Sequence, residues 1–345
     1  MSVASSPPVP KSSDPAPPGG FERARHWARA LAGAQGSVRR PVAFVVVAVI
    51  LASAIAPSFL RLANLNQLLI NSSFLIVLAV GEAFVIMVGS IDLGPESLLA
   101  SFGLLAGWLT VLHRVPTGLA LIVTLLSALI VGAVVGLLVA KVHIPSFVVT
   151  LGTFWGFRGV ALLVNGGEYI SPSSVTPAHP FGFEGLAGKT LGLSNLIWVS
   201  LLVVVVGQLV MTLTPFGLWL KSIGSNELAA RRVGLRADAL KVSVFVISAG
   251  LAALAGLMVT AYQGSIYPLT AQGFSLEAIA AVILGGIPFT GGRGTVVGAA
   301  LGALLVGIIN DLIVLIGLPA LYEYVFVAVV LIAAGLQARG GALTK

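Results

Sequence analysis

The sequence predicts an all-α polytopic membrane protein with about ten transmembrane helices. Charged residues make up 9% of the 345 residues and hydrophobic residues 57%, whereas a soluble domain carries about a quarter charged residues. So few charges cannot cover a globule in water, but they suit a surface that faces lipid. The apolar runs are continuous rather than alternating, which excludes an outer-membrane barrel. Backbone groups in lipid must be satisfied within their own segment, so these runs are predicted to be helices.

Ten apolar stretches have about the length that a bilayer requires, roughly 17–25 residues. The first resembles a signal peptide, because it ends in Ala54-Ile55-Ala56. The leader would be far too long, however, and Pro57 would follow the cut, so the stretch is predicted to be an uncleaved signal anchor. Gly and Pro interrupt the ends of the third and eighth stretches. The predicted spans lie near 42–58, 67–89, 97–113, 117–140, 146–164, 195–213, 241–262, 274–288, 295–316 and 322–338.

The two ends of the chain are predicted to lie outside the transmembrane domain. Residues 1–20 are rich in Pro, Ser, Ala and Gly, a composition typical of disorder. Residues 21–40 carry five arginines and are expected to form a basic surface helix. We therefore predict a cytoplasmic tail at 1–40, a transmembrane domain at 41–338 and a short cytoplasmic tail at 339–345.

The basic residues predict the orientation. An even number of spans puts both termini on one side, and if that side is the cytoplasm, 15 of the 19 Lys and Arg residues lie there. Three lie on the opposite side and one, Arg158, lies within a helix. This bias is typical of a multi-pass protein of the bacterial cytoplasmic membrane, and it accounts for the positive net charge without nucleic acid. Of the two long loops, 165–194 is predicted to be external and 214–240 cytoplasmic.

Several kinds of chemistry find no support in the sequence. The chain has no cysteine and four scattered histidines, which argues against a metal centre. The stretch Gly182–Thr190 resembles a phosphate-binding loop, but five residues separate its glycines where the motif needs four. It also lies on the predicted external side. His, Ser and Asp are not clustered as in a membrane-embedded enzyme, so the chain is predicted to be non-catalytic.

Six ionisable residues fall at membrane depth, where a charge costs at least ~2.5–3.5 kcal/mol at a helix centre. Two of them flank Gly94-Pro95, which must interrupt a helix. They are expected near the cytoplasmic ends of their helices, and either cap the helix at 97–113 or take a direct part in transport or subunit contact. If Glu96 only caps, Glu96→Gln should cost roughly 0.3–1 kcal/mol. For Arg158 a structural ion pair across helices competes with solute contact. The six are Glu82, Asp92, Glu96, Arg158, Glu277 and Asp311.

The predicted cytoplasmic loop contains its own short helix. Asn226 can cap it, Glu227 to Arg232 would form it, and Gly234 would end it with φ > 0. Leu228, Ala229 and Val233 give it a small apolar patch among charges. It is either a solvated loop helix or a docking element for a cytoplasmic partner.

Several motifs of the sequence resemble those of a known family. Gly224–Leu235 and the later stretch Ala280–Gly294 (AAVILGGIPFTGGRG) resemble the permease subunits of bacterial monosaccharide ABC importers of the ribose and xylose type. Gly89–Leu93 (GSIDL) and Pro145–Gly159 (PSFVVTLGTFWGFRG) match as well, and the likeness runs from about residue 42 to 338. The family usually has Ser-Val-Gly after Ile-Asp-Leu, where this chain has Gly-Pro-Glu, so the resemblance leaves the substrate open.

The resemblance implies an ABC-importer permease fold and a set of partners. Cytoplasmic ABC ATPase subunits would dock on 214–240 and would hold ATP and Mg²⁺, while this chain binds no cofactor. A periplasmic or lipid-anchored solute-binding protein would deliver a monosaccharide or similar polyol. A second permease copy or a paralogue would complete a dimer in the lipid bilayer.

Three sets of residues are predicted to carry this function. The substrate pathway would use polar and aromatic residues, namely Asp92, Phe154, Gln263, Asn310 and Asp311. The structural pair would be Glu96 and Arg158. ATPase coupling would use Asn226, Glu227, Ala229, Ala230, Arg231 and Gly234. The alternatives are an ion- or proton-coupled secondary transporter, or an ABC permease for nucleosides, inositols or branched-chain amino acids.

Overall fold

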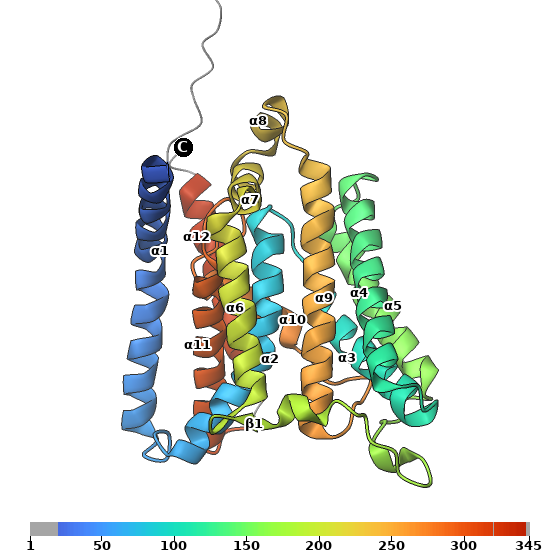
Figure 1. The fold of residues 1–345 in the computed structure, drawn as a ribbon. Helices are drawn as coiled ribbons and strands as arrows, with labels where there is room; N and C mark the ends of the chain where they lie inside the picture. The colour runs from blue at the N-terminus through green and yellow to red at the C-terminus, as the bar shows by residue number, and fades with distance from the viewer. Residues whose placement is uncertain (1–19, 320, 343–345) are drawn as a thin grey trace, which may run out of the picture.

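The computed structural model describes residues 20–319 and 321–342, and it forms one helical bundle in this part of the chain (Figure 1). A two-stranded antiparallel hairpin, β1 (Lys189–Thr190) and β2 (Leu193–Ser194), is the only sheet among these residues. The long helices are α1 (Gly20–Ile55), α2 (Leu62–Met87), α4 (Thr117–Ala140), α5 (Ser146–Val164), α6 (Asn195–Leu213), α9 (Ala237–Gln263), α11 (Val296–Leu315) and α12 (Tyr322–Ala342). The shorter helical elements are α3 (Pro95–Gly107), η1 (Trp108–Leu112), η2 (Pro172–Ser174), η3 (Glu184–Ala187), α7 (Pro215–Ser225), α8 (Glu227–Arg232) and α10 (Phe274–Leu284).

Eight helices in the described residues are long and apolar enough to cross a membrane, against ten predicted. The eighth predicted span corresponds to the shorter apolar helix α10, and the tenth to the apolar first part of α12, Tyr322–Ile332. The prediction of a complete span near 274–288 is wrong. The eleven residues of α10 extend about 16 Å at 1.5 Å per residue, roughly half of the ~30 Å hydrocarbon core.

The N-terminal prediction is only partly within the described residues. Most of the segment predicted to be disordered, 1–20, lies outside them, as does the end of the C-terminal tail. The basic segment 21–40 and the first predicted span do not form two elements, because α1 runs unbroken from Gly20 to Ile55 with Pro41 inside it.

The two ends of the bundle are occupied by different elements. The start of α1, the end of α12 and the short helices α7 and α8 lie at one end, at the top of Figure 1. The β1–β2 hairpin and the rest of the 165–194 segment lie at the opposite end. The two long loops predicted from the sequence therefore lie on opposite sides of the bundle.

Helix α2 forms the centre of the bundle. It is buried along most of its length and packs against α6, α9, α10 and α11. Helix α4 approaches α9 closely, because Gly132 and Gly136 present no side chain there. A Cβ atom at either position would lie 2.6 Å from the backbone of α9, at Phe245 or Val242.

Helices α3 and α10 both begin inside the bundle. Glu96, in the first turn of α3, contacts α5 at Arg158, which is well inside that helix. Glu96 also contacts the backbone at Gly273, directly before α10. The segment that leads into α3 follows the end of α2, and the segment that leads into α10, a run of turns at 268–273, follows the end of α9 at the opposite end of the bundle. The N-termini of the two helices meet.

Candidate functional site

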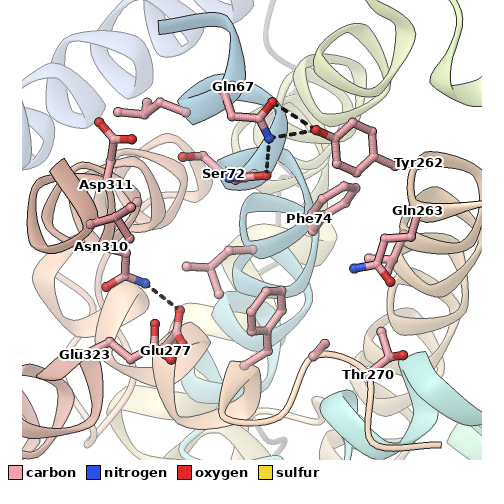
Figure 2. A pocket seen from close by; sticks show the side chains of 18 of the residues that line it. Gln67, Ser72, Phe74, Tyr262, Gln263, Thr270, Glu277, Asn310, Asp311 and Glu323 are labelled. Carbon is pink, nitrogen blue, oxygen red and sulfur yellow. Dashed lines mark hydrogen bonds between the residues drawn. The ribbon is translucent and has the colours of Figure 1, made fainter. Parts of the chain in front are cut away.

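A cavity of about 590 Å³ opens between α2, α9, α10, α11 and α12 (Figure 2). Asn64 and Gln67 lie near the start of α2 and Asp311 lies near the end of α11, so the cavity occupies the half of the bundle nearer to the β1–β2 hairpin. Its lining consists of Asn64, Gln67, Leu68, Asn71, Ser72, Phe74, Leu75, Val259, Tyr262, Gln263, Thr270, Ala271, Gln272, Phe274, Glu277, Gly307, Asn310, Asp311, Val314, Leu315 and Glu323.

The polar side chains of the cavity fall into two groups on opposite walls. On one wall Gln67 hydrogen-bonds to the Tyr262 hydroxyl at 2.7 Å and donates to Asn71 at 3.0 Å. On the other wall the Asn310 amide donates to the Glu277 carboxylate at 3.4 Å, close to Glu323 (Figure 2).

The charge of the lining is one-sided. It contains three carboxylates, Glu277, Asp311 and Glu323, and none of its residues is Lys, Arg or His. Asn64 donates to Asp311 at 2.8 Å, so this carboxylate has an amide partner but no cation in the cavity. The walls therefore offer many hydrogen-bond acceptors and no group that would neutralise an anion.

Aromatic rings complete the surface. Phe74 and Tyr262 pack with their ring centroids 5.8 Å apart, and Phe274 adds a third ring from the start of α10. An apolar ring face beside a few convergent polar groups is the usual composition of a small-molecule site.

The structure brings together three of the five predicted pathway residues. Gln263, Asn310 and Asp311 line the cavity, whereas Asp92 and Phe154 lie outside it. Phe154 is on α5, where its ring packs edge-on against Trp155 and lies 5.6 Å from the Arg158 guanidinium.

Asp92 is enclosed in a buried polar cluster. Its carboxylate accepts hydrogen bonds from the Gly94 backbone at 2.9 Å and from the Ser248 hydroxyl at 2.8 Å. The Asp92 backbone N–H donates to Glu82 at 3.2 Å, and Oε2 of Glu82 has no partner among the described residues. Ser248 lies near the middle of α9, so the expectation that Asp92 lies near a cytoplasmic helix end is wrong. The chain descends from α2 as an extended segment before α3 begins, which carries Asp92 into the bundle.

Glu96 and Arg158 form a buried ion pair. One Arg158 nitrogen lies 2.5 Å from the Glu96 carboxylate, and the two side chains are only 5% and 6% exposed. A second Arg158 nitrogen donates to the Pro268 carbonyl. Because Glu96→Gln would leave Arg158 charged, buried and without a counter-ion, we expect a larger effect than the loss of a helix cap alone would give.

A second polar network surrounds α8 at the other end of the bundle. The Asn226 side chain accepts from the Ala229 backbone at 3.0 Å and caps the helix, and Gly234 follows it with φ of 86°. Glu227 binds Arg231 at 2.9 Å and Lys241 of α9 at 2.7 Å. Partial burial alone would raise the pKa of Glu227, but the hydrogen bonds from Lys241 and Arg231 outweigh it and hold this pKa below its ordinary value.

Helix α8 thus has the bounds and caps that the sequence predicts. Its face toward the bundle is Ala230, which is buried. Its outer face presents Leu228 and Val233, which are 73% and 79% exposed. Arg231 also binds Asp238 at the start of α9, which fixes the helix to the bundle.

Residues 64–335 match the family model described as branched-chain amino acid transport system / permease component. The chain belongs to this permease family. It is 33% identical over 290 residues to the ribose import permease protein of Haemophilus influenzae, an alignment that covers 84% of this chain and 89% of the relative. It is 32% identical to the ribose import permease protein of Escherichia coli K12 over 84% of this chain and 90% of the relative.

A third relative belongs to an import system for another compound. The autoinducer 2 import system permease protein of Salmonella choleraesuis is 32% identical over 84% of this chain and 81% of its own length. No solved structure matches. The chain is therefore a membrane permease of the ABC-importer class, as its motifs predict.

Several residues that line this permease's cavity are not among those predicted from the sequence. Asn64, Gln67 and Asn71 follow one another at intervals of three and four along α2, which places them on one face of an otherwise apolar helix. That stripe was visible in the sequence and marks the cavity wall. The sequence shows that Glu277 lies at membrane depth but does not place it on the pathway, because its neighbours Asn310 and Glu323 are distant in the sequence.

Proposed function

We propose that this permease imports a monosaccharide or a similar small neutral polyol, and that the solute passes through the cavity around Glu277. The observation that carries the proposal is the composition of the cavity lining, which combines hydrogen-bonding side chains with aromatic rings and contains no Lys, Arg or His. Sugar hydroxyls can donate to the Glu277 and Asp311 carboxylates and to the amide oxygens, while the rings of Phe74 and Phe274 offer apolar faces. The resemblance to two ribose import permeases supports the same class of solute.

The same lining disfavours branched-chain amino acids, despite the description of the family. An amino acid carries a carboxylate, which in a site of low dielectric constant needs a cation or several donors. Three carboxylates already line this cavity. The ammonium of an amino acid could pair with them, but no Lys, Arg or His of the lining could pair with its carboxylate, whereas a neutral polyol needs no cation.

The orientation and the partners belong to the same proposal. The end of the bundle with α8 would face the cytoplasm, because 15 of 19 basic residues are assigned to that side. ATPase subunits would hold ATP and Mg²⁺ and would dock on α8, whose exposed Leu228 and Val233 suit a protein contact. A solute-binding protein would approach the opposite end, and a second permease copy or a paralogue would cover the exposed polar residues Gln67 and Asn71.

The test compares solutes in cells that express the permease with its ATPase and its binding protein. Uptake of labelled ribose is expected, and uptake of labelled leucine is not. Glu277→Gln should lower ribose uptake, because it removes the carboxylate that Glu277 contributes to the cavity wall. The matched control is Glu184→Gln, a carboxylate of the external segment that accepts only from the Phe181 and Gly182 backbones. Leucine uptake at the level of ribose uptake would refute the proposal.

A further inference from the structure

The backbone segment between α9 and α10 forms one wall of the cavity. This wall segment, 268–273, places Thr270, Ala271 and Gln272 in the lining. It is not a relaxed loop, because Ala271 has φ of +58° and Gly273 has φ of +96°. A residue with a Cβ at positive φ is strained and keeps that conformation only when its surroundings hold it there.

The Glu96–Arg158 pair holds the wall segment at both of its ends. Arg158 donates to the Pro268 carbonyl at the beginning of the segment. Glu96 accepts from the Gly273 backbone N–H, at 2.8 Å, at its end. Arg158 and Glu96 are joined at 2.5 Å, so one ion pair fixes both ends of the segment.

The pair itself is anchored outside the wall segment. Glu96 is in the first turn of α3, and Arg158 is in α5 with its guanidinium beside the Phe154 ring. Neither side chain lines the cavity. Local backbone contacts add further support: a turn joins Tyr267 and Thr270 with bonds of 3.0 and 3.1 Å, and the Ala271 carbonyl accepts from the Phe274 N–H at 3.1 Å. These contacts are made by neighbours in the chain, whereas the Glu96–Arg158 pair ties the segment to α3 and α5.

We propose that Glu96 and Arg158 are positioning residues for solute recognition, which set the conformation of the wall segment without touching the solute. The inference rests on the proposed function of the cavity. It also explains why an ion pair is buried here at all. A buried pair is weak support for stability alone, since apolar residues of similar volume often replace such a pair without loss.

The first arm of the test measures the wall itself, without any solute. The chain has no cysteine, so Gln272→Cys on the wall segment and Asn71→Cys on the opposite wall can each be labelled with a maleimide in purified protein. Arg158→Lys keeps the charge but lacks the fork that reaches both partners. It is expected to change the labelling rate at position 272 by on the order of two- to thirtyfold and to leave the rate at position 71 unchanged.

A milder variant guards against loss of folding. Glu96→Asp keeps both charges but shortens the side chain, so it cannot reach Arg158 and Gly273 together, and it should shift labelling at position 272 in the same direction. Unchanged labelling at position 272, or an equal change at positions 71 and 272, would overturn the proposal.

The second arm measures transport by the complete importer. Glu96→Asp should raise the ribose concentration that half-saturates uptake while the maximal ATP hydrolysis stays near that of the unaltered protein. A change in labelling without a change in half-saturation would also overturn the proposal. Absence of uptake of ribose and of other labelled monosaccharides and polyols by the unaltered importer would instead refute the proposed function, so the two failures are distinguishable.

Discussion

Ser275 and Glu96 cap each other's helices inside the bundle. The Ser275 hydroxyl of α10 accepts from the Glu96 backbone N–H at 3.0 Å, in the first turn of α3. The Glu96 carboxylate accepts from the backbone N–H of Gly273, which directly precedes α10. Each helix therefore supplies the side chain that satisfies an orphan donor of the other, as a buried helix start requires. These two bonds stabilise two helix starts that lie inside the bundle, away from either end.

The first prediction concerns the stability of this junction. Glu96→Gln should destabilise the folded permease by about 3–5 kcal/mol, because Arg158 would remain charged and unpaired in a buried site. Gln can still accept from the Gly273 N–H, so the loss is that of the ion pair. Thermal unfolding in detergent, followed by the loss of the monodisperse peak in size-exclusion chromatography, measures it.

A double variant is the control for this prediction. Glu96→Gln combined with Arg158→Met removes both charges, and it should recover much of the lost stability. If the double variant is no more stable than Glu96→Gln alone, the unpaired charge is not the cause.

The second prediction concerns α8. Gly234→Val should abolish stimulation of the partner ATPase, because a β-branched residue is strained at φ of 86° and would displace the end of the helix. Gly192→Val is the matched control, since Gly192 has φ of 82° but lies in the hairpin at the other end of the bundle. Both variants should remain folded. Equal ATPase stimulation in the two would contradict a docking role for α8.

The third prediction is the response of α8 to pH and salt. A carboxylate with a lowered pKa contributes stability that is present above its unfolded pKa and is lost as the pH falls through the folded value. Because Lys241 and Arg231 hold the pKa of Glu227 below its ordinary value, the network should be insensitive to pH between about 6 and 8. These ion pairs are partly exposed, so salt should weaken them. Coupling of ATP hydrolysis, measured at a series of pH and salt values, should therefore vary with salt and not with pH in this range.

Local patterns in the sequence are sufficient to predict the long helices and α8. The bounds of α4, α5 and α6 agree with the predicted spans to the residue, because each is a predominantly apolar run that lies between turn residues. The bounds of α8 follow from Asn226 and Gly234, whose effects are local. The predicted span at 274–288 is wrong because its outcome depends on contacts between distant parts of the chain. Hydropathy measures composition and not depth, and α10 begins inside the bundle because residues of α3 cap it.

The candidate site could be predicted only in part for the same reason. Asn310 and Asp311 are conspicuous as polar residues near the end of an apolar helix. Their contacts with Glu277 and Asn64 join helices that are far apart in the sequence. The sequence identifies Arg158 as an intramembrane charge, but the bond from Arg158 to the Pro268 carbonyl depends on a backbone segment without a sequence signature.

The fourth prediction is the orientation of the bundle. Leu228 on α8 and Leu191 in the hairpin are 73% and 86% exposed, at opposite ends of the molecule. In intact cells that express the permease without its ATPase, a membrane-impermeant maleimide should label Leu191→Cys and not Leu228→Cys. Both should react once the membrane is permeabilised, which controls for reactivity. The reverse pattern in intact cells would contradict cytoplasmic termini.

The last prediction separates ATP-driven import from proton coupling. Asp92 and Glu82 are buried close together, and no Lys or Arg among the described residues pairs with either one. In a proton-coupled transporter such carboxylates would relay the proton, and Asp92→Asn would abolish uptake. In the importer Asp92 has a structural role, because it accepts from Gly94 and from the Ser248 hydroxyl.

An Asn side chain can preserve both contacts, since its oxygen accepts from the Gly94 N–H and its amide donates to the Ser248 oxygen. We therefore expect Asp92→Asn to retain most ribose uptake, whereas Asp92→Leu, which has no polar atom, should lose it. Uptake by the unaltered importer should follow the ATP supplied to vesicles and should persist when an ionophore dissipates the pH gradient. Ribose uptake in vesicles without ATP, driven by a pH gradient and lost in Asp92→Asn, would contradict the importer mechanism.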